Sequence, residues 1–166
     1  PHAEDRAPAP LKTRVIGLGQ RHGGDDAVGR AVIARLRALA PPAALELIEV
    51  GDASALIDAL LSERRVILVD ALLGAGDPGR VHRLSPEQLG QGALAALSTH
   101  GLDVPQAIAL ARTLYPDAVS RRIELVGIEI ARATRFTEGL SPPVLAAVDE
   151  AAKAVMALAS EASPSG

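Results

Sequence analysis

Four aliphatic residues in succession, Val66, Ile67, Leu68 and Val69, leave a strand at this position without a face for solvent. A strand of this kind is buried on both sides, which is typical of parallel sheets that are covered by helices on both faces. The neighbouring segments agree, because short apolar runs alternate with stretches whose apolar residues recur at helical spacing. The sequence therefore predicts an α/β protein.

The predicted elements follow the order β-α-β-α-β-β-α-β-α. We expect strands at residues 13–18, 45–50, 66–71, 80–84 and 122–130, and helices at residues 27–39, 54–62, 103–114 and 141–159. The strand at 80–84 follows its predecessor too closely for a helical crossover, so we expect it to be antiparallel and at an edge. The expected fold is a three-layer α/β architecture with a twisted, mostly parallel five-stranded sheet, one antiparallel edge strand and helices on both faces.

The chain has 166 residues and no cysteine, and its length indicates a single domain. We expect the domain at residues 13–160 and flexible ends at residues 1–12 and 161–166, because the ends are polar and without pattern. The lack of cysteine excludes disulfides, thiolate metal ligands and a cysteine nucleophile. A net charge of −3 gives no basic field for nucleic acid. No apolar run has the length of a signal peptide or a membrane span, so we expect a cytoplasmic protein without membrane insertion.

Three reactive side chains fall in loops near the carboxyl ends of predicted strands, where open α/β sheets bind ligands. Asp26 ends the loop after the first strand, Asp70 ends the third strand's aliphatic run, and His100 precedes the helix at 103–114. If the first and third strands are neighbours, Asp26 and Asp70 face each other, and His100 extends toward them from its loop. Two carboxylates and one imidazole suit zinc, nickel or a similar divalent ion, which can polarise a carbonyl and activate water.

Each of these residues also has a structural interpretation. An acid before a helix is more often an N-cap than a ligand, and a loop histidine can simply be solvated. Asp70 is harder to explain, because a carboxylate after a buried run needs partners. Together the three residues support a metal site or an acid–base site. A catalytic dyad of Ser98 and His100 stays open as an alternative to the metal site. We interpret His82, on the predicted edge strand, as a surface residue.

The glycine-rich loop at residues 17–24 does not predict a dinucleotide site. His22 stands where the fingerprint requires its third glycine, and Asp25 and Asp26 would repel a pyrophosphate at the helix N-terminus. The signatures of P-loop enzymes, of common zinc proteases and of serine hydrolases are also absent from the sequence.

Four motifs in the same order resemble those of the nickel-iron hydrogenase maturation proteases. They are residues 15–20 with 24–29 (VIGLGQ and GDDAVG), 69–71 (VDA), 98–101 (STHG), and 127–130 with 139–142 (GIEI and GLSP). The resemblance runs from about residue 14 to residue 159. One position departs from the family pattern, because Gln20 stands where the family usually has asparagine.

The resemblance implies an endopeptidase that removes the C-terminal extension of the nickel-iron hydrogenase large-subunit precursor after nickel insertion. It also implies that Asp26, Asp70 and His100 bind the metal and are the catalytic residues, with Asp25 as the helix cap. Gln20 and Gly101, within two of the motifs, are expected to contact the substrate. The implied metal is nickel, carried by the protease or supplied by the substrate, and zinc or another divalent ion could substitute.

Two other classes of function remain open from the sequence. One is a non-proteolytic, metal-sensing maturation chaperone of the same fold, for which Gln20 in place of asparagine is the supporting feature. The other is an unrelated metal hydrolase or a purely structural domain. We expect a monomer whose partner is the large-subunit precursor, because weak charge and a lack of aromatic residues argue against a large permanent interface.

Overall fold

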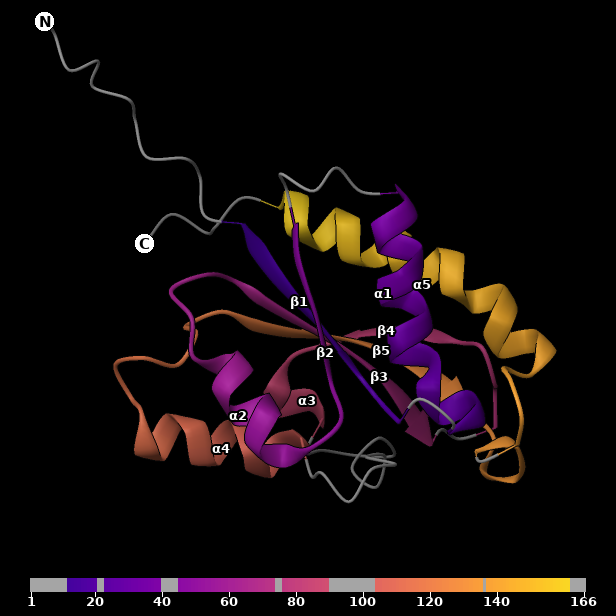
Figure 1. The fold of residues 1–166 in the computed structure, drawn as a ribbon, viewed down its shortest axis with the longest axis horizontal. Coiled ribbons are helices and arrows are strands. Elements are labelled where there is room, and N and C mark those ends of the chain that lie inside the picture. The colour runs from indigo at the N-terminus through magenta and orange to yellow at the C-terminus, as the bar shows by residue number, and fades with distance from the viewer. Residues whose placement is uncertain are drawn as a thin grey trace, which may run out of the picture.

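The computed structural model describes residues 12–20, 23–39, 45–73, 76–89, 104–135 and 137–161 (Figure 1). Five strands form one sheet in the order β2-β1-β3-β5-β4. They are β1 (Thr13–Leu18), β2 (Leu45–Val50), β3 (Val66–Leu73), β4 (Val81–Leu84) and β5 (Ile123–Ile130). All pairs are parallel except β4 with β5. The predicted mostly parallel sheet with one antiparallel edge strand is confirmed.

Helices cover both faces of the sheet, as predicted (Figure 1). On one face lie α1 (Val28–Leu39) and α5 (Pro142–Ser160), and on the other lie α2 (Ala53–Leu60), α3 (Pro86–Leu89) and α4 (Val104–Leu114). Successive residues of a strand point to opposite faces, so β3 contributes to two separate cores. Ile67 and Val69 pack on the side of α1 and α5, whereas Val66 and Leu68 pack on the side of α2 and α4.

Three local features differ from the sequence-based expectations. Strand β3 continues to Leu73, so Asp70 lies inside the strand and pairs with Gly127 of β5. The first turn before α1 is a separate 3-10 helix, η1 (Gly24–Ala27), and the short helix α3 was not predicted. Of the predicted flexible ends, residues 1–11 and 162–166 lie outside the described residues, as does Asp103, the first residue of the helix predicted at 103–114.

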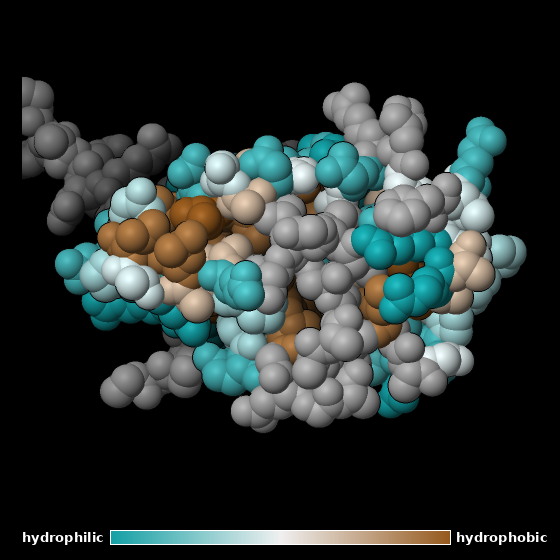
Figure 2. Space-filling model, turned by 90° about the horizontal axis from the view of Figure 1, so that it is seen from below, coloured by the Kyte–Doolittle hydropathy of each residue, from teal (hydrophilic) through white to brown (hydrophobic). Residues whose placement is uncertain are grey.

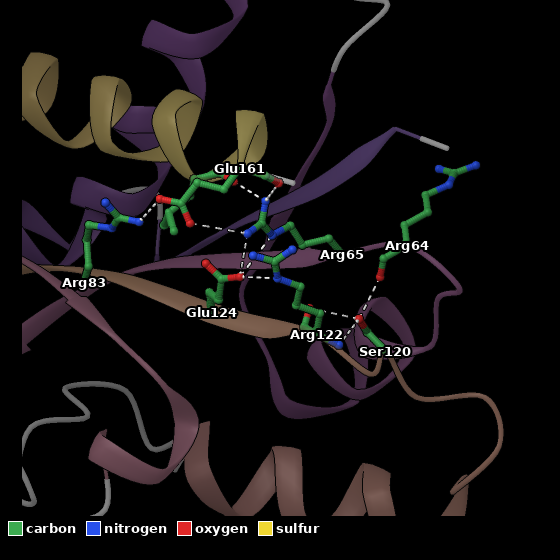
Figure 3. Close-up of polar contacts among 8 residues, drawn as sticks. Arg64, Arg65, Arg83, Ser120, Arg122, Glu124 and Glu161 are labelled. Atoms are coloured by element: carbon green, nitrogen blue, oxygen red, sulfur yellow. Dashed lines mark hydrogen bonds and ion pairs between the residues drawn. The ribbon is translucent and has the colours of Figure 1, made fainter. Parts of the chain in front are cut away.

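Ion pairs join the amino ends of β3 and β5 to the end of α5 (Figure 3). The Arg65 guanidinium lies 2.9 Å from Glu124 and donates hydrogen bonds to the backbone carbonyls of Leu158 and Glu161. Arg122 also donates to Glu124, at 2.8 Å. The Leu158 carbonyl also accepts from the Glu161 amide, so Arg65 adds side-chain donors at a helix end whose last carbonyls lack the usual helical partners. This edge of the sheet is held by matched charges.

The outward face of α4 carries exposed apolar side chains, and Figure 2 shows apolar residues gathered on that side of the molecule. Leu110, Leu114 and Tyr115 are each between 45% and 56% exposed.

Within the part of the chain that the structure describes, no helix combines the length and the apolar character that crossing a membrane requires.

Candidate functional site

Asp70 is a buried acid within the central strand, 3% exposed. The backbone amide of Ala71 donates a hydrogen bond to its carboxyl at 2.8 Å. Burial, opposed by the Ala71 hydrogen bond and assisted by the charge of Asp26, raises the pKa of Asp70 to about 8. At neutral pH the metal-free protein therefore keeps this carboxyl protonated for most of the time.

Asp26 lies in η1, within the connection between β1 and α1, and is 1% exposed. Its backbone amide donates to the carbonyls of Gly23, at 3.0 Å, and Arg135, at 3.4 Å. Its side-chain oxygen lies 3.6 Å from Nε of Arg135, within the range of an ion pair but beyond a hydrogen bond. The position of this acid is thus set by its own turn and by the segment that follows β5.

Two glycines of the first motif allow η1 and α1 to approach the sheet this closely. A Cβ on Gly19, whose φ is +144°, would lie 2.6 Å from the carbonyl oxygen of Asp26. A Cβ on Gly29 would lie 2.4 Å from the carbonyl of Leu18 and 2.6 Å from that of Val69. The start of α1 therefore rests directly on β1 and β3, which brings Asp26 toward Asp70.

The structure brings together two of the three predicted metal ligands. Strands β1 and β3 are neighbours, and the charge of Asp26 is felt at Asp70. His100, the third predicted ligand, and Gly101 lie outside the described residues. Gln20 is exposed and its amide donates to the carbonyl of Gly51 at 3.2 Å, which ties the loop after β1 to the connection between β2 and α2.

The donor set suits a divalent cation, although it is incomplete in the described residues. Among these residues, no group of three or more acids and histidines could hold a metal ion. Asp26 and Asp70 nevertheless place two buried carboxyl groups where the charge of one disfavours ionisation of the other. A cation between them would remove that repulsion, and carboxylate oxygens are accepted by zinc, nickel and harder ions. The two acids therefore fit the ion that the sequence motifs imply.

Asp25 does not cap the helix that it precedes, so this prediction is wrong. The position before η1 is Gly23, and no side chain caps that turn. Instead the fully buried carboxylate of Asp25 accepts three hydrogen bonds: from the hydroxyl of Thr134 at 2.5 Å, and from the amide and hydroxyl of Ser141, both at 2.7 Å. The Asp25 side chain therefore contacts the segment that follows β5 and does not cap the turn.

His82 is not a surface residue, contrary to the sequence-based interpretation. Its side chain is 16% exposed and its Nε2 lies 2.6 Å from Glu129, a buried acid near the end of β5. The amide of Asp77 donates to the second oxygen of Glu129 at 3.2 Å. Sequence reasoning missed this pair, although an acid inside the apolar run of β5 was a signal that a partner was needed.

Comparisons with known proteins point to one family. The model of the hydrogenase maturation protease family matches residues 31–158. Among solved structures, the chain is similar to the hydrogenase maturating endopeptidase HybD from E. coli, with a TM-score of 0.70, 22% identity, and coverage of 89% of this chain and 91% of that one. It is also similar to the [NiFe] hydrogenase maturation protease HybD from Thermococcus kodakarensis, with a TM-score of 0.71, 21% identity, and coverage of 90% and 99%.

A third similar structure is the hydrogenase 2 maturation peptidase from a Thaumarchaeota archaeon. Its TM-score is 0.63 at 25% identity, and the alignment covers 89% of this chain and 97% of that one. The comparison with curated protein sequences gave no match. The solved structures therefore share the fold of this chain over nearly its whole length.

Proposed function

This chain belongs to the hydrogenase maturation protease family, and on that premise we propose that it is a metal-dependent endopeptidase that removes the C-terminal extension of a nickel-iron hydrogenase large-subunit precursor after nickel insertion. The observation that supports the metal dependence is the pair of Asp26 and Asp70, two buried acids whose charges interact at the carboxyl edge of the sheet. A buried group with a raised pKa, such as Asp70, is more frequent at functional sites than elsewhere.

In this proposal Asp26, Asp70 and His100 hold the cation and are the catalytic residues. A divalent ion at this place supplies a Lewis acid that polarises the scissile carbonyl and lowers the pKa of a bound water. Asp70, whose pKa is about 8 in the metal-free protein, gives up its proton when it becomes a ligand. The backbone hydrogen bonds of Asp26 hold its turn in place, so its carboxylate extends from a fixed backbone position before the substrate arrives.

Nickel can reach this site in two ways, and each makes a different demand on the precursor. If the precursor carries the nickel, the acids of this chain complete its coordination only when a loaded precursor docks, so the same residues distinguish loaded from unloaded substrate. If the protease holds its own nickel, zinc or other divalent ion, cleavage follows the metal content of the protease. In both cases the partner is the large-subunit precursor, and we expect a monomeric enzyme that acts in the cytoplasm.

The test is cleavage of purified precursor, prepared with and without nickel and followed by mass spectrometry of its C-terminus. The wild type, Asp70→Ala and His100→Ala are compared with Asp117→Ala, a matched control at an exposed position. We expect shortening of the nickel-loaded precursor by the wild type and the control, and none by the two site variants. Undiminished cleavage by both site variants would overturn the proposal. Nickel-dependent binding without any shortening would instead assign the chain as a metal-sensing maturation chaperone.

A further inference from the structure

The connection between β5 and α5, residues 131–135 and 137–141, is fastened to the turn that carries Asp26. Asp25 makes this attachment, because its carboxylate accepts hydrogen bonds from Thr134 near the start of the connection and from Ser141 at its end. These partners are 109 and 116 residues away in sequence, so the contact is purely tertiary. Three donors on one buried carboxylate make this a strong and specific attachment.

The same connection also packs against the backbone of the turn. Gly24 has a φ of +57°, and a Cβ built there would lie 2.2 Å from the carbonyl oxygen of Thr137 and 2.9 Å from that of Thr134. Any side chain at this position would push the two segments apart. Asp25 and Gly24 of η1 therefore set how closely the connection between β5 and α5 packs against this turn.

Arg135 lies on this connection and meets Asp26 in two places. Its carbonyl accepts from the Asp26 amide at 3.4 Å, and its guanidinium lies 3.6 Å from the Asp26 carboxylate. The Arg135 side chain is 24% exposed, whereas that of Asp26 is 2% exposed. The guanidinium thus places a positive charge beside a buried acid, and it is itself partly exposed to solvent.

From these contacts we propose that Arg135 is a positioning residue, the counter-ion of Asp26 in the metal-free enzyme, and that it competes with the divalent cation for this carboxylate. A buried carboxylate without a positive partner is costly, so the guanidinium stabilises the site before the metal arrives. The contact between Arg135 Nε and the Asp26 carboxylate is 3.6 Å, whereas zinc binds carboxylate oxygens at about 2.0–2.2 Å, so a cation that coordinates the oxygen directly displaces the guanidinium. The inference rests on the proposed function, because it requires that Asp26 bind a metal.

The test is the affinity of the metal-free protein for Ni²⁺ and for Zn²⁺, measured by isothermal titration calorimetry. Arg135→Gln removes the competing charge, so we expect it to bind either ion about three- to tenfold more tightly than the wild type. Arg135→Lys keeps the charge and should stay within about twofold of the wild type. Arg132→Gln is the matched control, since Arg132 is an exposed arginine on the same connection and its affinity should not change.

The sign of the effect separates this role from a structural one. Damage to the fold would weaken metal binding, whereas loss of a competitor strengthens it. Equal affinities for Arg135→Gln and Arg132→Gln, or weaker binding by Arg135→Gln while Arg135→Lys resembles the wild type, would overturn the inference and leave the proposed function standing. A wild type that neither binds either ion nor shortens the precursor would overturn the proposed function, and the inference with it.

Discussion

The amino edge and the carboxyl edge of the sheet differ in how their charged side chains are paired and buried. At the amino edge, arginines and glutamates alternate in contact with one another, and Arg65 bridges Glu124 and the end of α5 (Figure 3). At the carboxyl edge, acids are buried with fewer cations beside them. Of the residues that the structure describes, the buried polar or charged ones are Asp25, Asp26, Asp70 and Glu129 at the carboxyl edge and Ser120 at the amino edge.

This difference separates charges that hold the fold together from charges that are kept for chemistry. Matched charges at the amino edge stabilise the fold, so removing one should lower stability. A buried acid that must be protonated in the metal-free protein opposes folding at neutral pH, so removing its charge should raise stability while activity is lost. Asp25 is an informative exception, because this acid of the carboxyl edge has three hydrogen-bond donors and should behave like a structural residue.

The largest effect is expected for Asp70→Asn in the metal-free protein. The folded pKa of about 8 lies above the ordinary aspartate value of 3.8, so the stability from the bound proton is complete below pH 3.8 and is lost as pH rises through about 8. Asparagine does not titrate. The variant should therefore gain up to about 4 kcal/mol over the wild type at pH 7, and little at pH 4.

The measurement is urea unfolding at several values between pH 4 and pH 8, with a chelator present. Other titrating groups act alike in both proteins, so the difference isolates Asp70. Asp117→Asn, at an exposed position, should follow the wild type at every pH. If Asp70→Asn loses stability with rising pH as steeply as the wild type does, the contrast between the edges fails.

At the amino edge, Arg65→Met should lower the free energy of unfolding by about 3 kcal/mol, because Glu124 and the last carbonyls of α5 lose a donor in a place where the arginine is only 9% exposed. This corresponds to a fall in Tm of about 6–12 °C, measurable by calorimetry. Arg121→Met, at an exposed position on the same edge, should change Tm by far less. Affinity for Ni²⁺ at low temperature should match the wild type, and a parallel loss of that affinity would mean that the two edges are not independent.

Asp25→Asn should cost about 2 kcal/mol, because an amide cannot accept from both hydroxyls and from the Ser141 amide as the carboxylate does. Asp149→Asn is the matched comparison, since Asp149 pairs with Arg35 at the surface, with side chains 59% and 43% exposed. That ion pair should be worth about 0.5 kcal/mol or less. Guanidinium unfolding measures both, and hydrogen exchange of the Ser141 amide should rise in Asp25→Asn alone. Similar losses in the two variants would place Asp25 with ordinary surface acids.

Most of the fold could be predicted because its signals are local. Aliphatic runs fix the strands, helical spacing fixes the helices, and the short gap before residue 80 fixes the antiparallel edge. The sequence did not fix the order of the strands, so the meeting of Asp26 with Asp70 depended on β1 and β3 being neighbours, which the structure confirms. Metal binding by these acids and by His100, and substrate contact by Gln20 and Gly101, stay predictions.

The errors concern side chains whose partners are distant in sequence. Local pattern assigns Asp25 to a helix cap, whereas its partners lie 109 and 116 residues away. His82 resembles a surface residue in the sequence, but the register pairs it with Gly127 of β5, and its ring reaches Glu129, two residues further along that strand. In both cases tertiary contact outweighs the local preference, and single-sequence patterns do not contain that information.

The smallest effect is expected at Gln20, where the chain departs from the family pattern. Gln20 lies at the carboxyl edge but is exposed and carries no charge, so the contrast between the edges predicts little change in stability when it is replaced. Gln20→Asn shortens the side chain by one methylene and weakens its hydrogen bond to Gly51, at a cost of about 0.5 kcal/mol.

If the amide contacts the substrate, as its place in the motif predicts, Gln20→Ala should raise KM for the precursor about threefold and leave kcat unchanged, with Gln20→Asn in between. Steady-state cleavage of the nickel-loaded precursor measures both constants, and a tenfold fall in kcat would instead place this uncharged side chain among the groups that act on the reacting atoms.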